Sequence, residues 1–362
     1  MTEFGSLEVN PTLRMSNGAI LAEPPAWKIH YFTPKNAQCS RSISASLAKV
    51  LLNLQLHPNP EDYLTSEAIH YLIAQDILVP KTRTPQYKCS VPHFEAATNI
   101  AQWKLNPHFT FFADAQKGAR LRKHAPWGGI TAEYSLNEEL TNAAWDLAHG
   151  TCNNRSALNS LHKVGYIGTQ EAFAQDELHQ QNLFLQWQEN YKTSKYTLIE
   201  NLVSQIELKS LQNYCADIQR RGFLDGDFGV AGKQRSHLFD DPQLRWLLER
   251  GAQLASKITN APLISSYSFL AFYHAGGVLP PHRDKSHCNI SMSLAINVPD
   301  DVSSTWPLEV QDPLGNSRNL YWGTGNTLLF DGRHYQHERS PMPSSDNAVY
   351  LILHFQLNPE YL

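Results

Sequence analysis

The sequence predicts an α+β protein of two domains. The chain has 362 residues, and domains of about 150 residues make two the first expectation. Apolar residues recur at helical spacing through much of the first half. After about residue 196 helical stripes come first, and strand alternation follows from Ser265. Helices followed by strands are typical of an α+β arrangement whose sheet closes late in the chain.

Composition excludes several classes of function. The 30 Lys and Arg are outnumbered by 34 Asp and Glu, so no basic stripe for nucleic acid is expected. No apolar run is long enough to span a membrane, and the N-terminus lacks a basic region followed by an apolar one. The five cysteines form no CxxC pair, which indicates reduced thiols and a cytoplasmic protein, and argues against a zinc site.

Residues 1–195 form the predicted N-terminal domain, which we expect to be mostly helical. Residues 1–40 read as an arm with short strands, and apolar spacing from Ser42 to Leu54 predicts a helix. Thr65 begins a second helix, and a short strand follows at 77–80. Helix, helix and strand are the outline of a winged-helix-like module. Such a domain recognises a substrate or partner, forms a homodimer contact, or has a purely structural role in packing against the rest of the protein.

The hydrophobic pattern is less informative between residue 80 and the second domain. Residues 81–135 are rich in Pro, aromatic residues and turn formers, and carry no assignable pattern. The helix predicted at 170–191 joins the two domains, which places the second at residues 196–362. Its first strand is expected at 198–206. Other helices are predicted at 135–149, 208–221 and 242–258.

Candidate metal ligands follow the strand predicted at Tyr267–Tyr273. That strand runs into Gly276-Gly277 and Pro280-Pro281, and His282-Arg283-Asp284 comes directly afterwards. In extended chain residues i and i+2 share a face, so His282 and Asp284 can converge on one metal ion. They are two of the three ligands of the facial triad that binds non-haem iron(II) and leaves coordination positions open.

The third ligand has two candidates, His334 and His337. Both lie about fifty residues after Asp284, so distance does not choose between them. We prefer His337, because it follows the loop after an apolar strand and closely precedes the last strand. His334 remains the alternative.

This order of motifs resembles the iron(II)/2-oxoglutarate-dependent oxygenases. A strand, a Gly-rich turn, His282-x-Asp284, the segment LLFDGRHYQH and a final strand carry the resemblance, over residues 198–358. Within that superfamily the chain is most similar to prolyl 4-hydroxylase-like and aspartyl/asparaginyl β-hydroxylase-like enzymes. The resemblance implies a double-stranded β-helix, or jelly roll, with supporting helices packed outside.

The resemblance also implies an activity. It is hydroxylation, or a related oxidation, of an amino-acid, peptidyl or carrier-tethered side chain, with Fe(II), O2 and 2-oxoglutarate, which is decarboxylated to succinate. Halogenases of the superfamily carry a small residue at the carboxylate position, so Asp284 excludes that subclass. A metal-binding β-barrel enzyme that does not use 2-oxoglutarate, and a non-catalytic peptide-binding protein, remain the alternative hypotheses.

Two predicted strands shape the expected cleft. Residues 288–298 alternate apolar side chains with small polar ones. In residues 348–355 one face is apolar, and the other carries Ala348, Tyr350, Ile352 and His354. The first strand is expected to be half-buried, with its polar face toward a co-substrate. A sheet edge facing water is the alternative.

The sequence departs from the family at the co-substrate anchor. The resemblance implies an Arg or Lys about ten residues beyond the distal histidine, where this chain has Asp346, Asn347 and Ala348. Hydrogen bonds to 2-oxoglutarate could come from Tyr273, Ser291, Ser293, Asn347 or His354, and a charge from Lys285, Arg318, Arg333 or Arg339. Arg235, expected in a loop, and Arg283 are candidates for contact with the substrate, with a solvated side chain as the alternative for Arg235.

Overall fold

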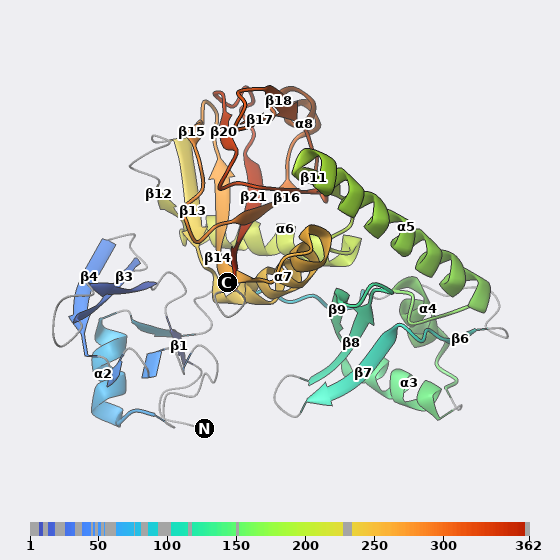
Figure 1. Cartoon of the computed structure of the whole chain (residues 1–362). Helices are drawn as coiled ribbons and strands as arrows, with labels where there is room; N and C mark the ends of the chain where they lie inside the picture. The colour runs from blue at the N-terminus through green and yellow to red at the C-terminus, as the bar shows by residue number, and fades with distance from the viewer. Residues whose placement is uncertain are drawn as a thin grey trace.

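The computed structural model describes residues 7–9, 14–18, 26–32, 38–44, 46–47, 50–51, 54, 63–75, 77–80, 86–92, 103–114, 118–149, 152–226 and 234–358. A unit with two β-sheets occupies the upper part of Figure 1, with the long helix α5 along its side. We call residues 169–358 the two-sheet unit and residues 86–168 the middle unit. Within the described residues, no helix combines the length and apolar character that a membrane span needs.

The larger sheet of the two-sheet unit has seven antiparallel strands in the order β11-β19-β16-β21-β14-β13-β12. These are β11 (Tyr196–Ile199), β12 (Asp225–Gly226), β13 (Arg235–Phe239), β14 (Leu263–Tyr273), β16 (Ile290–Asn297), β19 (Thr327–Phe330) and β21 (Ala348–Leu357).

The smaller sheet has the order β15-β20-β17-β18. Its strands are β15 (Leu279–His282), β17 (Leu308–Gln311), β18 (Ser317–Leu320) and β20 (Gln336–Arg339), and the short helix α8 (Asp300–Thr305) precedes β17. One buried cluster includes Tyr350 from the larger sheet and Val310 from the smaller one. This α+β unit with a large antiparallel sheet is consistent with the expected jelly roll.

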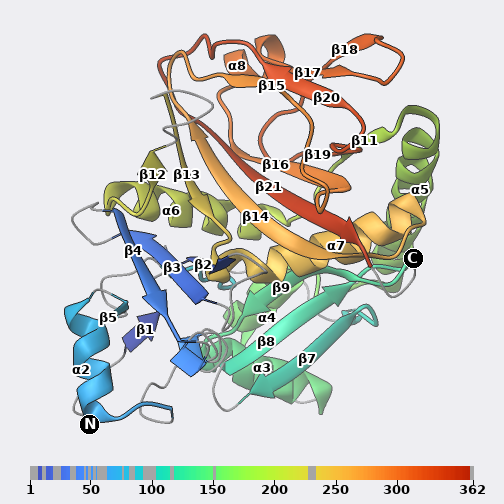
Figure 2. The same ribbon diagram turned by 60° about the vertical axis from the view of Figure 1, so that its left-hand side comes forward.

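Two helices cover the other face of the larger sheet, α6 (Gln205–Arg220) and α7 (Arg245–Thr259), the latter preceded by a 3-10 turn (Pro242–Leu244). Figure 2 shows both along the side of the sheet opposite the smaller sheet. A core cluster holds Leu211 and Leu248 from these helices together with Met292 and Leu353 from the sheet. The helices predicted at 208–221 and 242–258 are confirmed.

Strand β16 is buried on both faces. Every residue from 288 to 296 is buried, because helices cover one face and the interior between the sheets takes the other. The prediction of a half-buried strand is therefore wrong, and so is its alternative, a sheet edge facing water. The predicted alternation is confirmed: Met292 and Leu294 belong to the helix-side core, and Ala295 belongs to the cluster between the sheets.

The beginning of the larger sheet also differs from expectation. A strand was predicted at 198–206, whereas the observed strand is Tyr196–Ile199. It ends early because Ser204 caps helix α6: its hydroxyl accepts from the Glu207 amide, and the Glu207 carboxylate accepts from the Ser204 amide. Arg235 lies in strand β13, whereas a loop was predicted.

Helix α5 (Gln170–Ser194) begins after Thr169, whose side chain accepts from the Ala172 amide, and ends at Lys195 in the left-handed conformation. Its Trp187 and Tyr191 are buried in the helix-side core of the larger sheet. Helix α5 therefore packs as part of the two-sheet unit, and the boundary predicted at 195/196 falls between it and β11.

The middle unit has a three-stranded antiparallel sheet of β7 (Phe109–Asp114), β8 (Gly118–His124) and β9 (Ile130–Ser135). Beside it lie α3 (Glu138–Ala148), α4 (Arg155–Lys163) and the pair β6 (Lys104–Leu105) and β10 (Ile167–Gly168). The prediction of a mostly helical N-terminal domain is therefore wrong for the middle unit. Strand pairing, which brings Phe111 opposite Leu121, organises a segment whose Pro and aromatic residues obscure any period.

The first eighty residues contain short elements. They are β1 (Leu7–Val9), β2 (Arg14–Gly18), β3 (Ala26–Phe32), β4 (Gln38–Ile43), α2 (Ser66–Ala74) and β5 (Leu78–Pro80). Strands β2, β3 and β4 form one sheet, and β1 pairs with β5. Where a helix was predicted from Ser42 to Leu54, Ser42 and Ile43 belong to β4 instead, and the described residues 46, 47, 50, 51 and 54 are helical. The winged-helix-like arrangement stays a prediction.

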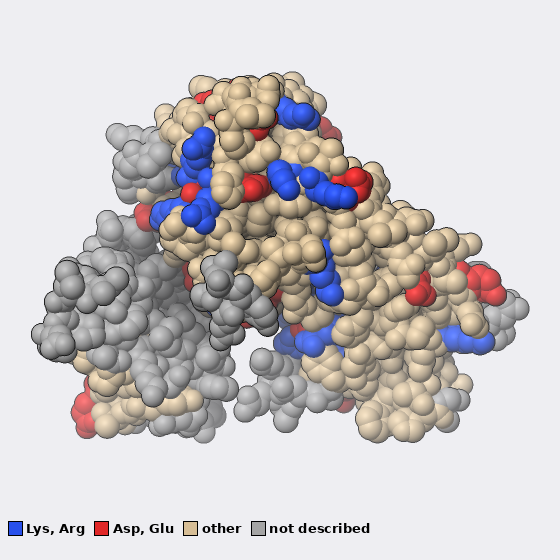
Figure 3. Space-filling model, in the orientation of Figure 1, with Lys and Arg blue, Asp and Glu red and all other residues tan. Residues whose placement is uncertain are grey.

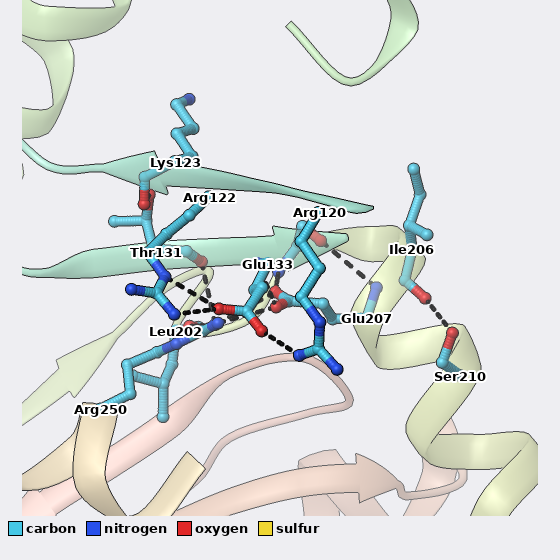
Figure 4. Close-up of polar contacts among 11 residues, drawn as sticks. Arg120, Arg122, Lys123, Thr131, Glu133, Leu202, Ile206, Glu207, Ser210 and Arg250 are labelled. Atoms are coloured by element: carbon cyan, nitrogen blue, oxygen red, sulfur yellow. Dashed lines mark hydrogen bonds and ion pairs between the residues drawn. The ribbon is translucent and has the colours of Figure 1, made fainter. Parts of the chain in front are cut away.

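A buried ion pair connects the middle unit to the two-sheet unit (Figure 4). Glu207 on α6 accepts from Arg250 Nη2 on α7 at 2.8 Å and from the Glu133 amide of β9 at 2.9 Å. Arg250 Nη1 donates to the Thr131 carbonyl, also on β9, at 3.0 Å. Because both charged groups are buried and hydrogen-bonded, this pair fixes β9 against α6 and α7.

Candidate metal centre

Strand pairing brings the predicted metal ligands together. His282 is the last residue of β15 and pairs directly with His337 on β20. Their ring centroids are 4.2 Å apart. Asp284 follows two residues later, and its amide donates to the Gly332 carbonyl at 2.9 Å. Segments about fifty residues apart in sequence thus place two imidazoles and one carboxylate at one point.

The three ligand atoms have metal-binding geometry. Nε2 of His282 lies 3.8 Å from Oδ1 of Asp284, and Nε2 of His337 lies 3.6 Å from the same oxygen. One ligand atom from each of the three residues lies within 4.8 Å of the others. Atoms bound about 2.1 Å from one ion are at most about 4.2 Å apart. Both histidine-to-carboxylate separations lie within this limit, so the group could hold a single ion.

Backbone carbonyls set the tautomer of both histidines. Nδ1 of His282 lies 2.9 Å from the Pro280 carbonyl oxygen, and Nδ1 of His337 lies 3.1 Å from that of Tyr335. A carbonyl only accepts, so Nδ1 carries the proton and Nε2 keeps its lone pair for a metal. Burial lowers the pKa of His337, which favours the neutral imidazole that metal binding requires.

A serine and a third histidine orient the carboxylate. The Ser291 hydroxyl donates to Oδ2 of Asp284 at 2.5 Å, and its oxygen lies 2.9 Å from Nδ1 of His354. The hydroxyl has one proton, and the carboxylate can only accept it, so His354 Nδ1 donates to the serine oxygen. Burial lowers the pKa of His354 to about 4, which keeps this imidazole neutral. Oδ1 of Asp284 is left to face the two histidines.

Gly332 provides the space for this carboxylate, a role that sequence reasoning missed. A Cβ atom at residue 332 would lie 1.9 Å from Oδ2 of Asp284 and 3.0 Å from Oγ of Ser291. Any side chain here would displace the carboxylate or its serine partner. The Asp-Gly sequence before His334 predicts a turn, but only the fold shows what the missing side chain makes room for.

The alternative third ligand lies away from the centre. The side chain of His334 is 63% exposed, and its Nδ1 bonds Oδ1 of Asp331 at 2.9 Å. It is absent from the described group of metal-ligating residues, which contains His337 instead. The geometry therefore favours the preferred candidate.

The metal centre opens into a cavity of about 500 Å³ between the sheets. Of the residues predicted to bind co-substrate or substrate, those lining it are Tyr273, Ser293, His354, Lys285, Arg339, Arg235 and Arg283. Asn347 is not among the described lining residues, and its Oδ1 lies 2.8 Å from Nδ1 of His274. Arg318 is exposed and donates to the Tyr196 hydroxyl. Ser291 contacts Asp284 rather than the cavity.

Arg339 is one of two buried cations that line the described cavity, and Arg235 is the other. Arg339 lies two residues beyond His337 on β20 and is 4% exposed. Its guanidinium lies over the rings of Trp306, Trp322 and Tyr350, 4.4, 4.7 and 4.5 Å from the centroids, and Nη1 donates to the Trp306 carbonyl at 2.9 Å. The nearby ion pairs of described residues involve Asp284 or Asp331, and none includes Arg339. A buried cation in this position favours an anionic ligand.

Known proteins were compared with this chain by sequence and by structure. No protein-family model and no curated protein matches the sequence. Among solved structures, a Pseudomonas putida prolyl-4-hydroxylase has 17% identity, covers 48% of this chain and 99% of its own, and has a TM-score of 0.42. A Trichoplax adhaerens prolyl hydroxylase, bound to a hypoxia inducible factor peptide fragment, has 12% identity, coverages of 49% and 91%, and a TM-score of 0.42. The α-ketoglutarate-dependent carbocyclase SnoK of nogalamycin biosynthesis has 13% identity, coverages of 47% and 83%, and a TM-score of 0.40. The similar structures include enzymes of the family that the sequence motifs resemble.

Proposed function

We propose that the protein is an iron(II)- and 2-oxoglutarate-dependent oxygenase that hydroxylates or otherwise oxidises an amino-acid or peptidyl side chain. The convergence of His282 Nε2, His337 Nε2 and Asp284 Oδ1 beside a cavity is the observation that carries the proposal. Two histidines and one carboxylate would hold iron(II) and leave coordination positions open for co-substrate and oxygen.

Iron(II) in this centre would supply oxygen activation. One oxygen atom of O2 enters the substrate and the other enters succinate as 2-oxoglutarate loses CO2. The chain holds and orients the reactants. The hydrogen bonds at Nδ1 of His282 and His337 and at Oδ2 of Asp284 fix the three ligand atoms before a metal arrives.

Arg339 is the proposed anchor for the distal carboxylate of 2-oxoglutarate. It shares β20 with His337, and both residues line the cavity. A guanidinium can donate two parallel hydrogen bonds to a carboxylate, and the rings of Trp306 and Trp322 hold it in place and keep water away. The positive charge absent from residues 346–348 would thus come from β20, the preceding strand in the chain.

The proposal is tested by anaerobic titration of the Fe(II)-loaded protein with 2-oxoglutarate. We expect a visible charge-transfer band from the chelated metal, and no band with H337A or D284A. H334A is the matched control, because His334 is exposed and outside the metal group. Iron binding without a band would favour the metal enzyme that does not use 2-oxoglutarate. Failure to bind one equivalent of iron would favour the non-catalytic binding protein.

The proposal also covers the role of residues 1–195 and the cellular location. A peptide or carrier-tethered substrate would give residues 1–195 a role in recognition, and a homodimer contact is the other role we propose for them. The described cysteines, Cys89, Cys152, Cys215 and Cys288, are all free, which supports a cytoplasmic location.

A further inference from the structure

We infer that the substrate presents the flat face of an aromatic ring to this site, and that the ring edges of Tyr267 and Phe269 receive it. The inference rests on the proposed function, and it narrows the substrate to an amino acid or peptide with an aromatic side chain. Its basis is the order of the strands that line the cavity.

The co-substrate position follows two neighbouring strands, β21 and β16. At one end His354 of β21 pairs with Ser291 of β16, whose hydroxyl donates to Asp284. At the other end the ring of Tyr350, also on β21, lies 4.5 Å from the guanidinium of Arg339. A molecule that reaches from the metal position to Arg339 therefore lies along these two strands.

The next two strands of the same sheet, β14 and β13, carry aromatic side chains beside that position. Tyr267 of β14 pairs with His354, and Phe269 pairs with Ile352. Tyr267 and Phe269 are half-buried and line the cavity, as does His237 of β13. We call Tyr267, Phe269 and His237 the aromatic wall. Since the co-substrate lies along β21 and β16, this wall is left for the substrate.

The aromatic wall meets the cavity with ring edges. Phe239 of β13 is stacked on Tyr267 with 4.7 Å between centroids, and the ring of His354 lies 4.7 Å away on the opposite side, because β13 and β21 flank β14. His237 is stacked on Phe269, also at 4.7 Å, with 17° between the planes. Side chains stand nearly perpendicular to a sheet, so rings stacked across neighbouring strands direct their edges into the cavity.

Contacts behind the aromatic wall hold these edges in place. The buried Cys288 thiol donates to the Tyr267 hydroxyl at 3.6 Å. Phe239 also meets Phe269 edge to face, with 6.5 Å between centroids and 78° between planes. Rings that are already fixed by their neighbours lose little further entropy when a ligand binds.

Arg235 bounds the aromatic wall at the end away from His354. It begins β13, pairs with Tyr273 of β14 and is 9% exposed. Its guanidinium lies 5.4 Å from the ring centroid of Phe269 and 5.5 Å from that of Tyr273, and Nη1 donates to the Tyr273 hydroxyl at 3.3 Å. The solvated side chain offered as its alternative is therefore wrong, and Arg235 is part of the cavity lining.

Ring edges favour one kind of ligand surface. The edge of an aromatic ring is electrostatically positive and its face is negative, so an edge-to-face contact is favourable. A saturated ring has no negative face, and a perfluorinated ring has the opposite distribution of charge. The aromatic wall should therefore bind an ordinary aromatic ring more tightly than either.

The outer surface gives no reason to expect selection by long-range charge. The whole chain carries a formal charge of −4. On the face drawn in Figure 3, Lys and Arg side chains are scattered, and Asp and Glu lie beside several of them. A mixed surface of this kind attracts neither sign of ligand strongly, so uncharged probes are suited to testing the cavity.

The test compares the N-acetyl amides of phenylalanine, cyclohexylalanine and pentafluorophenylalanine. Their dissociation constants are measured by calorimetry on the Fe(II) protein saturated anaerobically with 2-oxoglutarate. We expect the phenylalanine amide to bind about five-fold or more tightly than either of the others, which corresponds to about 1 kcal/mol for the edge-to-face contacts. A cavity that was merely apolar would prefer the other two, because both are more hydrophobic. That order, equal binding, or no binding of the phenylalanine amide would overturn the inference.

Variants locate the effect. F269L and Y267L should each lower the preference for the phenylalanine amide, whereas F112L, which alters β7 of the middle unit, should keep it. Full preference in either F269L or Y267L would overturn the role given to that ring. The charge-transfer band, recorded on each sample before the probe is added, reports the proposed function separately. Its absence from the unaltered protein would refute that function, whereas its presence without the preference would refute only this inference.

Discussion

At the scale of single residues, the Ser291 hydroxyl decides which oxygen of Asp284 faces the metal position. It donates to Oδ2 and receives a hydrogen bond from His354. We expect S291A to lower iron(II) affinity about 10–100-fold, the usual effect of removing a partner of a metal-binding side chain. Anaerobic calorimetry measures this. S293A is the matched control, since Ser293 points the same way from β16 and lines the cavity, whereas the described serine hydrogen bond to Asp284 comes from Ser291.

Equal iron affinity in S291A and S293A would show that the serine does not orient Asp284. A fall in both would point to a general loosening of β16. The two serines alternate with Met292, which packs into the helix-side core, so thermal melting of each variant distinguishes a damaged strand from a lost hydrogen bond.

Arg339 gives the second prediction at this scale. R339Q should raise the dissociation constant for 2-oxoglutarate about 10–100-fold, because one charge-assisted contact contributes about 1.5–3 kcal/mol, and should leave iron affinity nearly unchanged. The charge-transfer band, followed against 2-oxoglutarate concentration, measures it. R333Q is the control, since Arg333 is exposed. Undiminished 2-oxoglutarate affinity in R339Q would move the anchor to another cation.

At the scale of elements, helix α6 carries the most consequential buried charge outside the metal centre. E207Q removes one half of the ion pair with Arg250 and leaves that guanidinium buried. Breaking a buried pair in this way costs about 3–5 kcal/mol. We expect urea denaturation of E207Q to show a loss of that size.

The control for E207Q lies on the same helix. Asp217 pairs with Arg220 and Arg221 at the more exposed end of α6, and pairs of this kind contribute about 0.3–0.5 kcal/mol. D217N should therefore change stability little. Similar losses in E207Q and D217N would contradict the view that the Glu207–Arg250 pair joins β9 to the two-sheet unit.

Strand periodicity was the most predictive signal at this scale. It correctly separated the residues of β16 and β21 that face the helices from those that face the smaller sheet. It could not report that both faces of β16 are covered, because burial depends on which elements pack above and below. The middle unit shows the opposite failure, since its strands are organised by pairing partners that no local pattern marks.

At the scale of the whole molecule, the question is where the two-sheet unit begins. Trp187 and Tyr191 of α5 are buried in its core. A fragment of residues 169–362 keeps this helix and its Thr169 cap, whereas a fragment of residues 196–362 loses both. Loss of a buried Trp alone costs about 3–5 kcal/mol. We expect the shorter fragment to be insoluble or to melt well below the longer one.

Solubility and circular-dichroism melting of the two fragments check this. Both fragments lose the β9 contacts of Glu207 and Arg250, so the full chain should be the most stable of the three and serves as the reference. If residues 196–362 melted at the same temperature as residues 169–362, the unit would begin at the boundary predicted from sequence.

The sequence by itself determined the candidate ligands. The i and i+2 rule of extended chain predicted that His282 and Asp284 share a face, and position before the last strand favoured His337. These are local regularities, and the group His282, Asp284 and His337 is the one that the fold brings together. Only the tertiary structure decided the surroundings. Arg339, Gly332, Arg235 and the Ser291–His354 pair act across strands or between two sheets, and the register and packing that place them are properties of the folded chain rather than of any short segment.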